Sequence, residues 1–213
     1  MNNTRRGLFV TLDGPSGVGK TTTTRRLWNY LSVRGFSVHT TTEPSKTTLG
    51  NTARHNTETY RGLTLACLVA ADRYHHLETE VRPKVDAGYI VICDRYVASS
   101  YVLQRMDDVP LPFIEAINSA ADLPDLAIIL EAPASVTAAR VAARGVHSRF
   151  HAGVSSSEQE TDLYKQAAAR LRASGYPVLT FDTSETGPAG VTERLGTRIA
   201  DMATDPSTKP ATA

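Results

Sequence analysis

The sequence predicts an α/β fold in which a parallel sheet of five strands is flanked by helices on both faces. Short apolar runs rich in β-branched residues alternate along the chain with longer stretches of helical periodicity. Those runs lack the period-two alternation of a strand that faces water on one side, which is typical of strands buried on both faces. A glycine-rich turn also joins the first strand to the first helix.

The expected strands are short segments bounded by turn residues, and the third and fourth of them are continuous apolar runs. The first leads directly into the glycine-rich turn, and the last is the shortest. The expected strands are Leu8–Leu12, Phe36–Thr41, Tyr89–Cys93, Leu126–Leu130 and Val178–Phe181. Their spacing leaves room for a helix after most of them, as a parallel sheet requires.

Helical periodicity fills the segments between and after the strands. The longest expected helix ends at Gly88, and Pro83 predicts a kink or a break near its end, because proline removes a helical hydrogen bond. The expected helices are Lys20–Val33, Arg61–Ala87, Tyr96–Arg105, Pro112–Ala121, Ser135–Arg144, Glu158–Ala173 and Val191–Met202.

The composition is that of one domain with a sizeable core. The chain has 213 residues, of which 41% are hydrophobic, and a formal net charge of +1. Residues 1–203 are expected to form a single domain, and residues 204–213, which are small, polar and proline-containing, a disordered tail. Because this net charge gives no general field for a polyanion, neither nucleic acid nor a membrane is expected as a partner, and the ligand should be small.

The two cysteines give a further indication of where the protein works. Cys67 and Cys93 each lie inside an apolar run, with no CxxC pair and no histidine at metal-ligand spacing. They are expected to be buried free thiols in a reducing compartment, rather than a disulfide or a zinc site. The first residues lack the apolar region of a signal peptide, so a soluble cytoplasmic protein is expected.

Residues 14–21 fit the pattern G-x-x-x-x-G-K-[ST] at every fixed position. In such a loop, backbone N–H groups and the helix N-terminus bind phosphate, Lys20 reaches the β and γ oxygens, and the Thr21 hydroxyl ligates Mg2+. The expected nucleotide-binding residues are Gly14, Pro15, Ser16, Gly17, Val18, Gly19, Lys20, Thr21 and Thr22. The sequence therefore predicts binding of ATP or GTP together with Mg2+.

Other features favour a kinase over a GTPase or a mechanical ATPase. The sequence has no Asn-Lys-x-Asp motif, no Asp-x-x-Gly switch after an apolar strand and no transporter-type signature. The third strand ends in Asp94-Arg95-Tyr96, at the sheet edge where open α/β folds bind ligands. We expect Asp94 to help hold Mg2+ and Arg95 to hold an acceptor phosphate; the alternative is a helix-capping aspartate beside a surface arginine.

Four segments, in this order and spacing, resemble those of thymidylate kinases over residues 7–203. They are Leu12–Thr22, Thr42–Pro44, Ala70–Arg73, and Asp94–Tyr96 followed by Ser99 and Gln104. The resemblance implies the phosphate-loop nucleoside monophosphate kinase fold, with a five-stranded parallel sheet and a closing lid. It also implies that the protein moves the γ-phosphoryl group of ATP onto dTMP, with Mg2+, and that it is a homodimer.

The resemblance assigns roles to single residues. Asp13 matches an acidic residue near the acceptor sugar and the metal, and with Lys20 it is an implied catalytic residue. Arg54 and Arg95 match arginines that hold the acceptor phosphate, and Arg73 matches one that reads a thymine carbonyl. The implied acceptor-binding residues are Asp13, Glu43, Arg54, Val69, Arg73, Arg95, Ser99, Ser100, Leu103 and Gln104.

The catalytic arginine is expected in the lid. One branch of the family carries such an arginine inside the phosphate loop, and this loop has none. Arg144 and Arg149 lie where the lid should be, at about residues 144–157, so the sequence resembles the branch whose lid supplies the charge. An arginine that reaches a transferring phosphoryl group can contribute about 10³–10⁵ in rate. The alternative for Arg149 is a solvated surface charge.

The acceptor pocket departs from the family pattern. Val69 stands where an aromatic residue usually stacks on thymine, and Leu103 where Tyr or Phe usually packs beside the sugar. Thr42 and Ser45 replace the Arg and Gly that usually flank Glu-Pro. Two alternatives therefore stay open: a paralogue for another or modified pyrimidine nucleotide or for a non-nucleotide acceptor, and an ATP-binding module without acceptor chemistry.

Overall fold

The computed structural model describes residues 6–144, 154–184 and 186–205, and it contains the expected parallel sheet. The five strands are β1 (Leu8–Asp13), β2 (Val38–Thr42), β3 (Ile90–Asp94), β4 (Leu126–Glu131) and β5 (Val178–Asp182). Their order across the sheet is β2-β3-β1-β4-β5, and every pair of neighbours is parallel. The fold class predicted from the sequence is confirmed.

The strand register brings three chain segments to one point at the carboxyl edge of the sheet. Leu12 of β1 pairs with Asp94 at the end of β3, and Thr42 at the end of β2 pairs with the same Asp94. On its other side, β1 pairs Asp13 with Ile129 of β4. The loops that follow β1, β2 and β3 therefore start side by side, where a ligand can contact all three.

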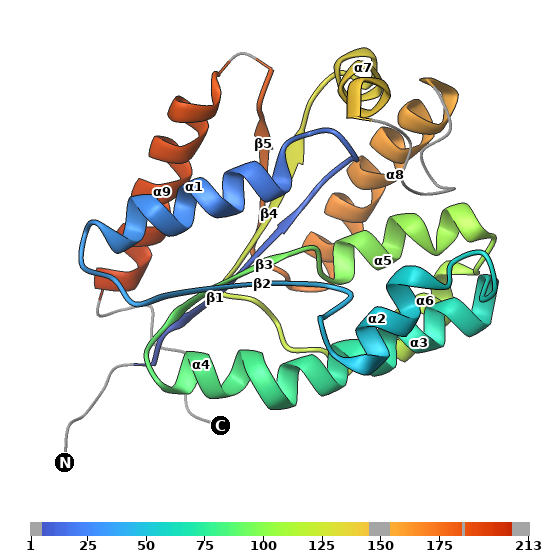
Figure 1. Ribbon diagram of the computed structural model, residues 1–213, viewed down its shortest axis with the longest axis horizontal. Coiled ribbons are helices and arrows are strands. Elements are labelled where there is room, and N and C mark those ends of the chain that lie inside the picture. Colours follow the sequence, from blue (N-terminus) through green and yellow to red (C-terminus); the bar gives the residue numbers. More distant parts are fainter. Residues whose placement is uncertain (1–5, 145–153, 185, 206–213) are drawn as a thin grey trace.

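Helices cover both faces of the sheet (Figure 1). Helices α1 and α9 pack against each other on one face, while α3, α5 and α8 cover the other. The helices are α1 (Lys20–Ser32), α2 (Thr48–His55), α3 (Gly62–His76), α4 (Arg82–Asp86), α5 (Val97–Leu103), α6 (Leu111–Ile117), α7 (Ala134–Arg144), α8 (Val154–Ala173) and α9 (Pro188–Thr204). Among the described residues, no helix is both long and apolar enough to cross a membrane.

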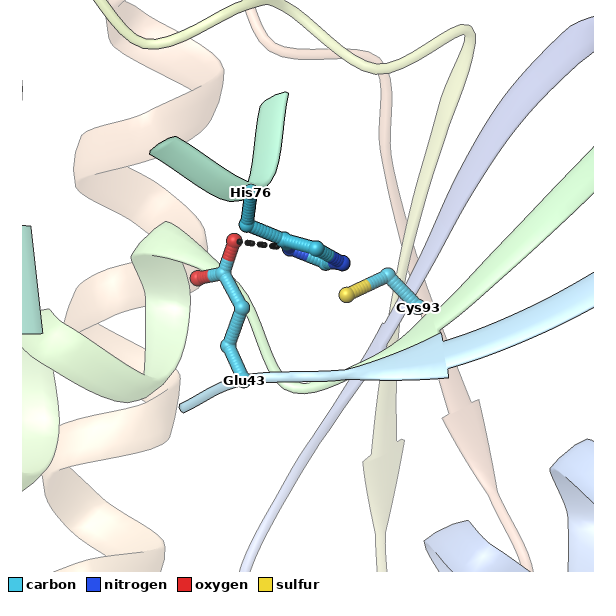
Figure 2. A group of neighbouring side chains, drawn as sticks. All are labelled: Glu43, His76 and Cys93. Atoms are coloured by element: carbon cyan, nitrogen blue, oxygen red, sulfur yellow. Dashed lines mark hydrogen bonds and ion pairs between the residues drawn. The ribbon is translucent and has the colours of Figure 1, made fainter. Parts of the chain in front are cut away.

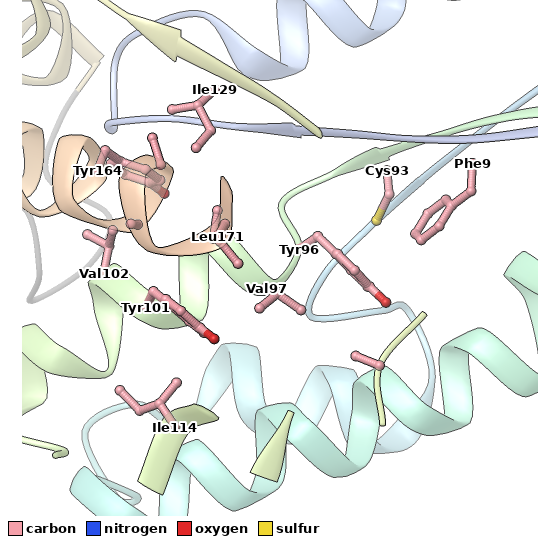
Figure 3. Packing of buried hydrophobic residues seen from close by; sticks show 14 of the residues in the cluster. Phe9, Cys93, Tyr96, Val97, Tyr101, Val102, Ile114, Ile129, Tyr164 and Leu171 are labelled. Carbon is pink, nitrogen blue, oxygen red and sulfur yellow. The ribbon is translucent and has the colours of Figure 1, made fainter. Parts of the chain in front are cut away.

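The apolar core is divided by the sheet into two clusters. Alternate residues of β1 serve the two faces, since Leu8 and Val10 join the cluster under α1 and α9, while Phe9 joins the other. In that second cluster the Phe9 ring meets the Tyr96 ring edge-on at 5.1 Å (Figure 3). Because both faces of the sheet are covered, the central strands β3 and β4 need apolar residues at nearly every position, which explains their unbroken runs.

Several boundaries differ from the sequence-based expectation. The expected helix Arg61–Ala87 consists of α3, a π-helical segment (Leu77–Val81) and α4, so the register changes just before Pro83. Pro83 lacks the N–H that a regular helix would use there, which is consistent with the widened turn preceding it. The expected helix Tyr96–Arg105 ends as a 3-10 turn, Arg105–Asp107.

Three further expectations are corrected. Helix α2 was not expected at all, because its eight residues carry little apolar periodicity. Cys93 is buried, but Cys67 is exposed, since it lies on the outer face of α3. Thr204, expected in the tail, is the last residue of α9.

The expected lid overlaps the end of α7 and the start of α8, and residues 145–153 lie outside the described residues, as do residues 206–213.

Helix α2 is positioned by a close approach between its own backbone at Gly50 and the backbone of Ser45. A Cβ atom on Gly50 would lie 2.2 Å from the Ser45 carbonyl oxygen and 2.5 Å from the Ser45 nitrogen. Ser45 has little freedom to move, because the Asp72 carboxylate accepts hydrogen bonds from its backbone N–H and from its hydroxyl, each at 2.6 Å. The loop after β2 and helix α2 therefore lock together, and this positions Arg54 on α2.

We predict that Gly50→Ala destabilises the protein by roughly 1–3 kcal/mol, because the added methyl group overpacks a rigid contact. Helix propensity alone would instead raise the free energy of unfolding by about 1 kcal/mol, because alanine favours a helix more than glycine does. Urea unfolding measures the change, with Thr52→Ala on the same helix as the control. The Thr52 hydroxyl donates to the helix's own Thr48 carbonyl, so its removal should have a small effect. A more stable Gly50→Ala variant would contradict the packing.

Candidate active site

The phosphate loop follows β1 and leads into α1 through residues with left-handed backbone angles. Gly14, Gly17 and Gly19 have φ values of 140°, 85° and 109°. A Cβ atom would lie 2.4 Å from the Leu130 carbonyl oxygen at Gly14, and 2.5 Å from the Thr137 carbonyl oxygen at Gly17. Glycine is thus required both for the turn and for the close approach to β4 and α7.

Lys20 lies folded back into this loop. Its Nζ donates to the carbonyl oxygens of Gly14 at 2.7 Å and Pro15 at 3.0 Å, and the side chain is buried rather than displayed on an open turn. Burial, together with the nearby charge of Arg95, lowers the pKa of Lys20 to about 7. An arriving polyphosphate would add opposite charge beside this buried amine.

Two oxygen donors face each other at the adjoining strand ends. The Thr21 hydroxyl, at the start of α1, donates to Asp94 Oδ2 at 2.6 Å. A hydroxyl and a carboxylate are the hard oxygen ligands that Mg2+ prefers, and Mg2+ usually completes its shell with water and phosphate oxygens. The donor set of Thr21 and Asp94 therefore fits Mg2+.

Arg95 is presented by a strained turn directly after β3. Its φ is 78°, a conformation unusual for a residue with a side chain, and its N–H donates to the Leu12 carbonyl at 3.0 Å. Arg95 Nη1 donates to the Ser99 hydroxyl at 3.3 Å and to the Tyr164 hydroxyl at 3.4 Å. Neither partner carries a compensating charge, so the guanidinium remains suited to an anion.

Asp13 holds this turn in place. Its Oδ1 accepts hydrogen bonds from the Tyr96 N–H at 2.9 Å, the Ser99 N–H at 3.0 Å and the Ser99 hydroxyl at 2.7 Å. Burial raises the pKa of Asp13, although these donors and the neighbouring cations oppose the rise. Asp13 does not line the acceptor cavity described next, and its observed contacts are those of a residue that positions Arg95.

A cavity of about 220 Å³ lies beside Arg95, between α2, α3 and α5. Apart from Asp13, all the residues expected to bind the acceptor line it: Glu43, Arg54, Val69, Arg73, Arg95, Ser99, Ser100, Leu103 and Gln104. These residues are spread over more than sixty positions of the sequence. The structure gathers them around one space with arginines at several points of its wall.

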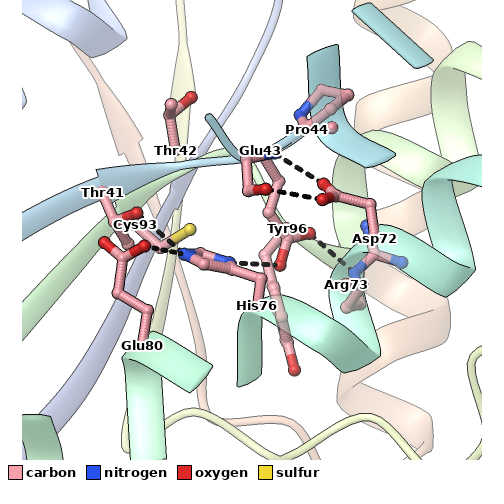
Figure 4. A network of polar contacts seen from close by, with 12 residues as sticks. Thr41, Thr42, Glu43, Pro44, Asp72, Arg73, His76, Glu80, Cys93 and Tyr96 are labelled. Atoms are coloured by element: carbon pink, nitrogen blue, oxygen red, sulfur yellow. Dashed lines mark hydrogen bonds and ion pairs between the residues drawn. The ribbon is translucent and has the colours of Figure 1, made fainter. Parts of the chain in front are cut away.

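Arg73 is the most completely buried cation of this wall (Figure 4). Its Nε donates to Glu43 Oε2 at 2.7 Å, its Nη2 to the Ser100 hydroxyl at 3.0 Å, and its Nη1 to Asn118 Oδ1. Burial by itself would lower the pKa of Arg73, but the charge of Glu43, its hydrogen bond to Arg73 and the neighbouring Tyr96 and Asp13 together outweigh burial and raise it. Arg73 is therefore a fixed, permanently charged donor.

Gln104 contributes an unpaired acceptor to the same wall. Its Oε1 is buried and has no hydrogen-bond partner among the described residues. A buried polar atom without a partner costs free energy, and a ligand that donates a hydrogen bond would recover it. Val69 and Leu103 supply aliphatic surface where the family pattern has aromatic rings.

Two other cavities adjoin the phosphate loop. One, of about 450 Å³, is lined by Gly17, Val18, Gly19, Thr22, Thr23, Arg140, Ala143, Thr183, Pro188 and Val191. Its place beyond the loop, between α7 and α9, suits the base of a bound nucleotide. The other, of about 550 Å³, extends from Thr21 and Asp94 to Arg54 and Lys46. Arg54 lines both this cavity and the acceptor cavity.

Several residues of the site were not predicted from the sequence. Glu160 of α8 accepts hydrogen bonds from the Ser16 N–H at 3.1 Å and the Ser16 hydroxyl at 3.3 Å, so it fastens α8 to the phosphate loop. Asn118, Lys46 and Arg140 were missed as well. No local motif marks these residues, and Glu160, Asn118 and Arg140 reach the site from far along the chain. The side chain of Arg144, and Arg149 as a whole, lie outside the described residues, so their catalytic role stays a prediction.

Glu43, His76 and Cys93 meet behind the acceptor cavity, where sequence spacing had indicated no ligand cluster (Figure 2). Their ligand atoms lie within 4.8 Å of one another, and all three residues are buried. The Cys93 thiol donates to the Arg95 carbonyl at 3.1 Å, and burial raises its pKa well above the ordinary value. A metal ion would need the thiolate, so we interpret the cluster as a packed polar network.

The comparisons with known proteins agree with this geometry. The family model described as thymidylate kinase matches residues 12–186. A probable thymidylate kinase of Caldivirga maquilingensis is 37% identical over 81% of this chain and 84% of its own. Thymidylate kinases of Pseudomonas fluorescens and Caldicellulosiruptor saccharolyticus are 36% and 32% identical, over 68% and 80% of this chain and 73% and 90% of theirs. The chain belongs to the thymidylate kinase family.

Proposed function

We infer that the protein is a nucleoside monophosphate kinase that transfers the γ-phosphoryl group of ATP to dTMP and forms dTDP and ADP. Membership of the thymidylate kinase family supports the reaction and the donor. The observation that carries the proposal is the juxtaposition of the phosphate loop with the acceptor cavity, with Arg95 between them. A module that only bound ATP would have no use for Arg54, Arg73 and Arg95 gathered at that cavity.

The chemistry asks the protein chiefly to bring two anions together. A 5′-phosphate oxygen of dTMP attacks the γ-phosphorus, and the bond to the β–γ bridging oxygen breaks, leaving its electron pair on ADP. Lys20 and the loop N–H groups hold the donor phosphates, while Arg95 and Arg54 hold the acceptor phosphate. Mg2+, held by Thr21 and Asp94, would neutralise charge on the donor phosphates.

The acceptor base is recognised by its hydrogen-bonding edge. We propose that Arg73 donates to a carbonyl of thymine and that Gln104 offers its unpaired acceptor to the adjacent imide N–H. Cytosine carries an amine in place of the carbonyl and an acceptor in place of the N–H, so it would face Arg73 and Gln104 with the wrong groups. A site built around such hydrogen bonds rejects analogues that cannot make them.

Further properties of the protein are proposals from the family resemblance. We propose that the enzyme uses Mg2+, works in the cytoplasm and forms a homodimer, and that residues 1–203 act as one catalytic domain with a lid near 144–157. Arg149 or Arg144 is proposed as the lid arginine. Size-exclusion chromatography with light scattering, with and without dTMP, measures the oligomeric state directly.

A coupled assay with ATP and a panel of nucleoside monophosphates tests the function. We expect turnover to be highest with dTMP, followed by dUMP, and kcat/KM for dCMP to be lower by about two orders of magnitude or more. Because Leu103 replaces the usual aromatic ring beside the sugar, UMP should be rejected less strongly than dCMP. A preference for dCMP or AMP, or no turnover with any of these acceptors, would contradict the assignment.

Val69→Phe should lower KM for dTMP by about fivefold, because a ring under a nucleobase contributes roughly 1–3 kcal/mol in comparable stacking arrangements. Val69→Leu adds bulk without a π face and is the matched control, for which no tighter binding is expected. Steady-state kinetics at saturating ATP measures both variants. Equal effects of Phe and Leu would show that the base does not lie over residue 69.

ATP binding should take up about one proton near pH 8, because Lys20 has its pKa lowered to about 7 in the free protein and regains charge beside the phosphates. The uptake should vanish below the free pKa, where Lys20 is already protonated. Correspondingly, ATP affinity should fall as the pH rises above about 7. Calorimetric titrations in buffers of different ionisation enthalpy count the protons. The Lys20→Met variant should show none, and an undiminished uptake in it would assign the proton elsewhere.

A further inference from the structure

A chain of buried polar side chains continues behind Arg73, away from the acceptor cavity (Figure 4). Glu43 uses its two carboxylate oxygens in opposite directions. Oε2 accepts from Arg73 at 2.7 Å, and Oε1 lies 3.2 Å from His76 Nδ1. His76 is fully buried on the last turn of α3, and Glu43 is 3% exposed. The orientation of Arg73 thus depends on a carboxylate that has its own second support.

The imidazole of His76 is itself fixed from the far side. Its Nε2 lies 2.8 Å from the Thr41 hydroxyl and 3.6 Å from Glu80 Oε2. Glu80 is only half-buried, and its other oxygen lies 2.8 Å from His39 Nε2. With a proton on Nδ1, His76 donates to Glu43, and the Thr41 hydroxyl, which also bonds to Glu80, lies at hydrogen-bond distance from Nε2. Each member of the chain limits the rotation of the next, from the protein surface to the base-reading arginine.

A buried carboxylate shared between an arginine and a histidine is sensitive to the loss of either donor. Without the His76 N–H, Oε1 of Glu43 would be a buried oxygen with one fewer donor, which is costly. Glu43 could then relieve that cost by rotating, and Arg73 Nε would follow it or lose its partner. Ser100 and Asn118 would still hold the two Nη atoms, so Arg73 would be displaced rather than released.

We propose that His76 is a positioning residue for recognition of the acceptor base: through Glu43, it sets the direction in which Arg73 donates. The proposal rests on the proposed function, in which Arg73 reads a pyrimidine carbonyl. His76 touches neither nucleotide, and it acts on the preference for thymine over cytosine rather than on phosphoryl transfer. The structural reason is that the Lys20, Thr21 and Asp94 group shares no hydrogen bond with His76.

Two substitutions at this position separate positioning from packing. His76→Leu keeps apolar bulk and removes both ring nitrogens, whereas the amide nitrogen of His76→Asn can replace Nδ1. For His76→Leu we expect KM for dTMP to rise about tenfold and the dTMP-to-dCMP ratio of kcat/KM to fall about tenfold, with KM for ATP within about twofold. His76→Asn should restore most of the ratio.

Leu77→Ala is the matched control for general loosening of the helix. Leu77 is the next residue, is fully buried and packs in the apolar core rather than in the polar chain. It should lower the melting temperature while leaving the dTMP-to-dCMP ratio unchanged. If His76→Leu changes the ratio no more than Leu77→Ala does, or if a folded His76→Asn fails to restore it, the proposal is overturned.

Two more variants keep the test decisive. If His76→Leu does not fold, Thr41→Val removes the hydroxyl that fixes Nε2, and it should lower the ratio by about threefold; an unchanged ratio would count against the proposal. Arg73→Gln tests the underlying function separately, since it should abolish the preference for dTMP. If Arg73→Gln leaves that preference intact, the acceptor assignment fails; if only the His76 variants leave it intact, the positioning role alone fails.

Discussion

The end of β1 is fastened to the turn after β3 by one buried carboxylate, and the arrangement of the site depends on this contact. Asp13 accepts hydrogen bonds from the backbone of Tyr96 and from both the backbone and the hydroxyl of Ser99. The same strand end continues into the phosphate loop, so the turn that carries Arg95 is held at a fixed place beside that loop. The left-handed backbone of Arg95 persists because its surroundings determine it.

The buried cations around the site are compensated to different degrees, and this difference matches their proposed tasks. Arg73 has a carboxylate partner, Glu43, and is suited to a neutral carbonyl. Lys20 donates to backbone carbonyls and Arg95 to hydroxyls, so both remain suited to phosphate oxygens. The two arginines are already charged when the nucleotides arrive and need little reorganisation, which is the usual source of electrostatic catalysis.

The sequence by itself determined the parts of the site that lie close together along the chain. Residues 14–21 form the phosphate loop because glycine spacing, the preceding apolar strand and the following helix are all local properties. Asp94 and Arg95 could be placed at the sheet edge for the same reason, since they directly follow an unbroken apolar run. The alternation of such runs with helical periodicity was also sufficient for the parallel sheet, because strands covered on both faces leave a clear pattern.

Only the tertiary structure decided how distant residues divide the work. Asp13, whose role beside the acceptor stays a prediction, also holds the turn before α5. Glu160 reaches the phosphate loop from α8, and His76 supports Glu43 from the end of α3. These contacts join residues 33 to 144 positions apart, and single polar residues carry no periodic signal of their own. Packing against the sheet fixes which face of a helix meets which strand end. The sequence therefore contains these side chains, but only the fold determines which of them contact one another.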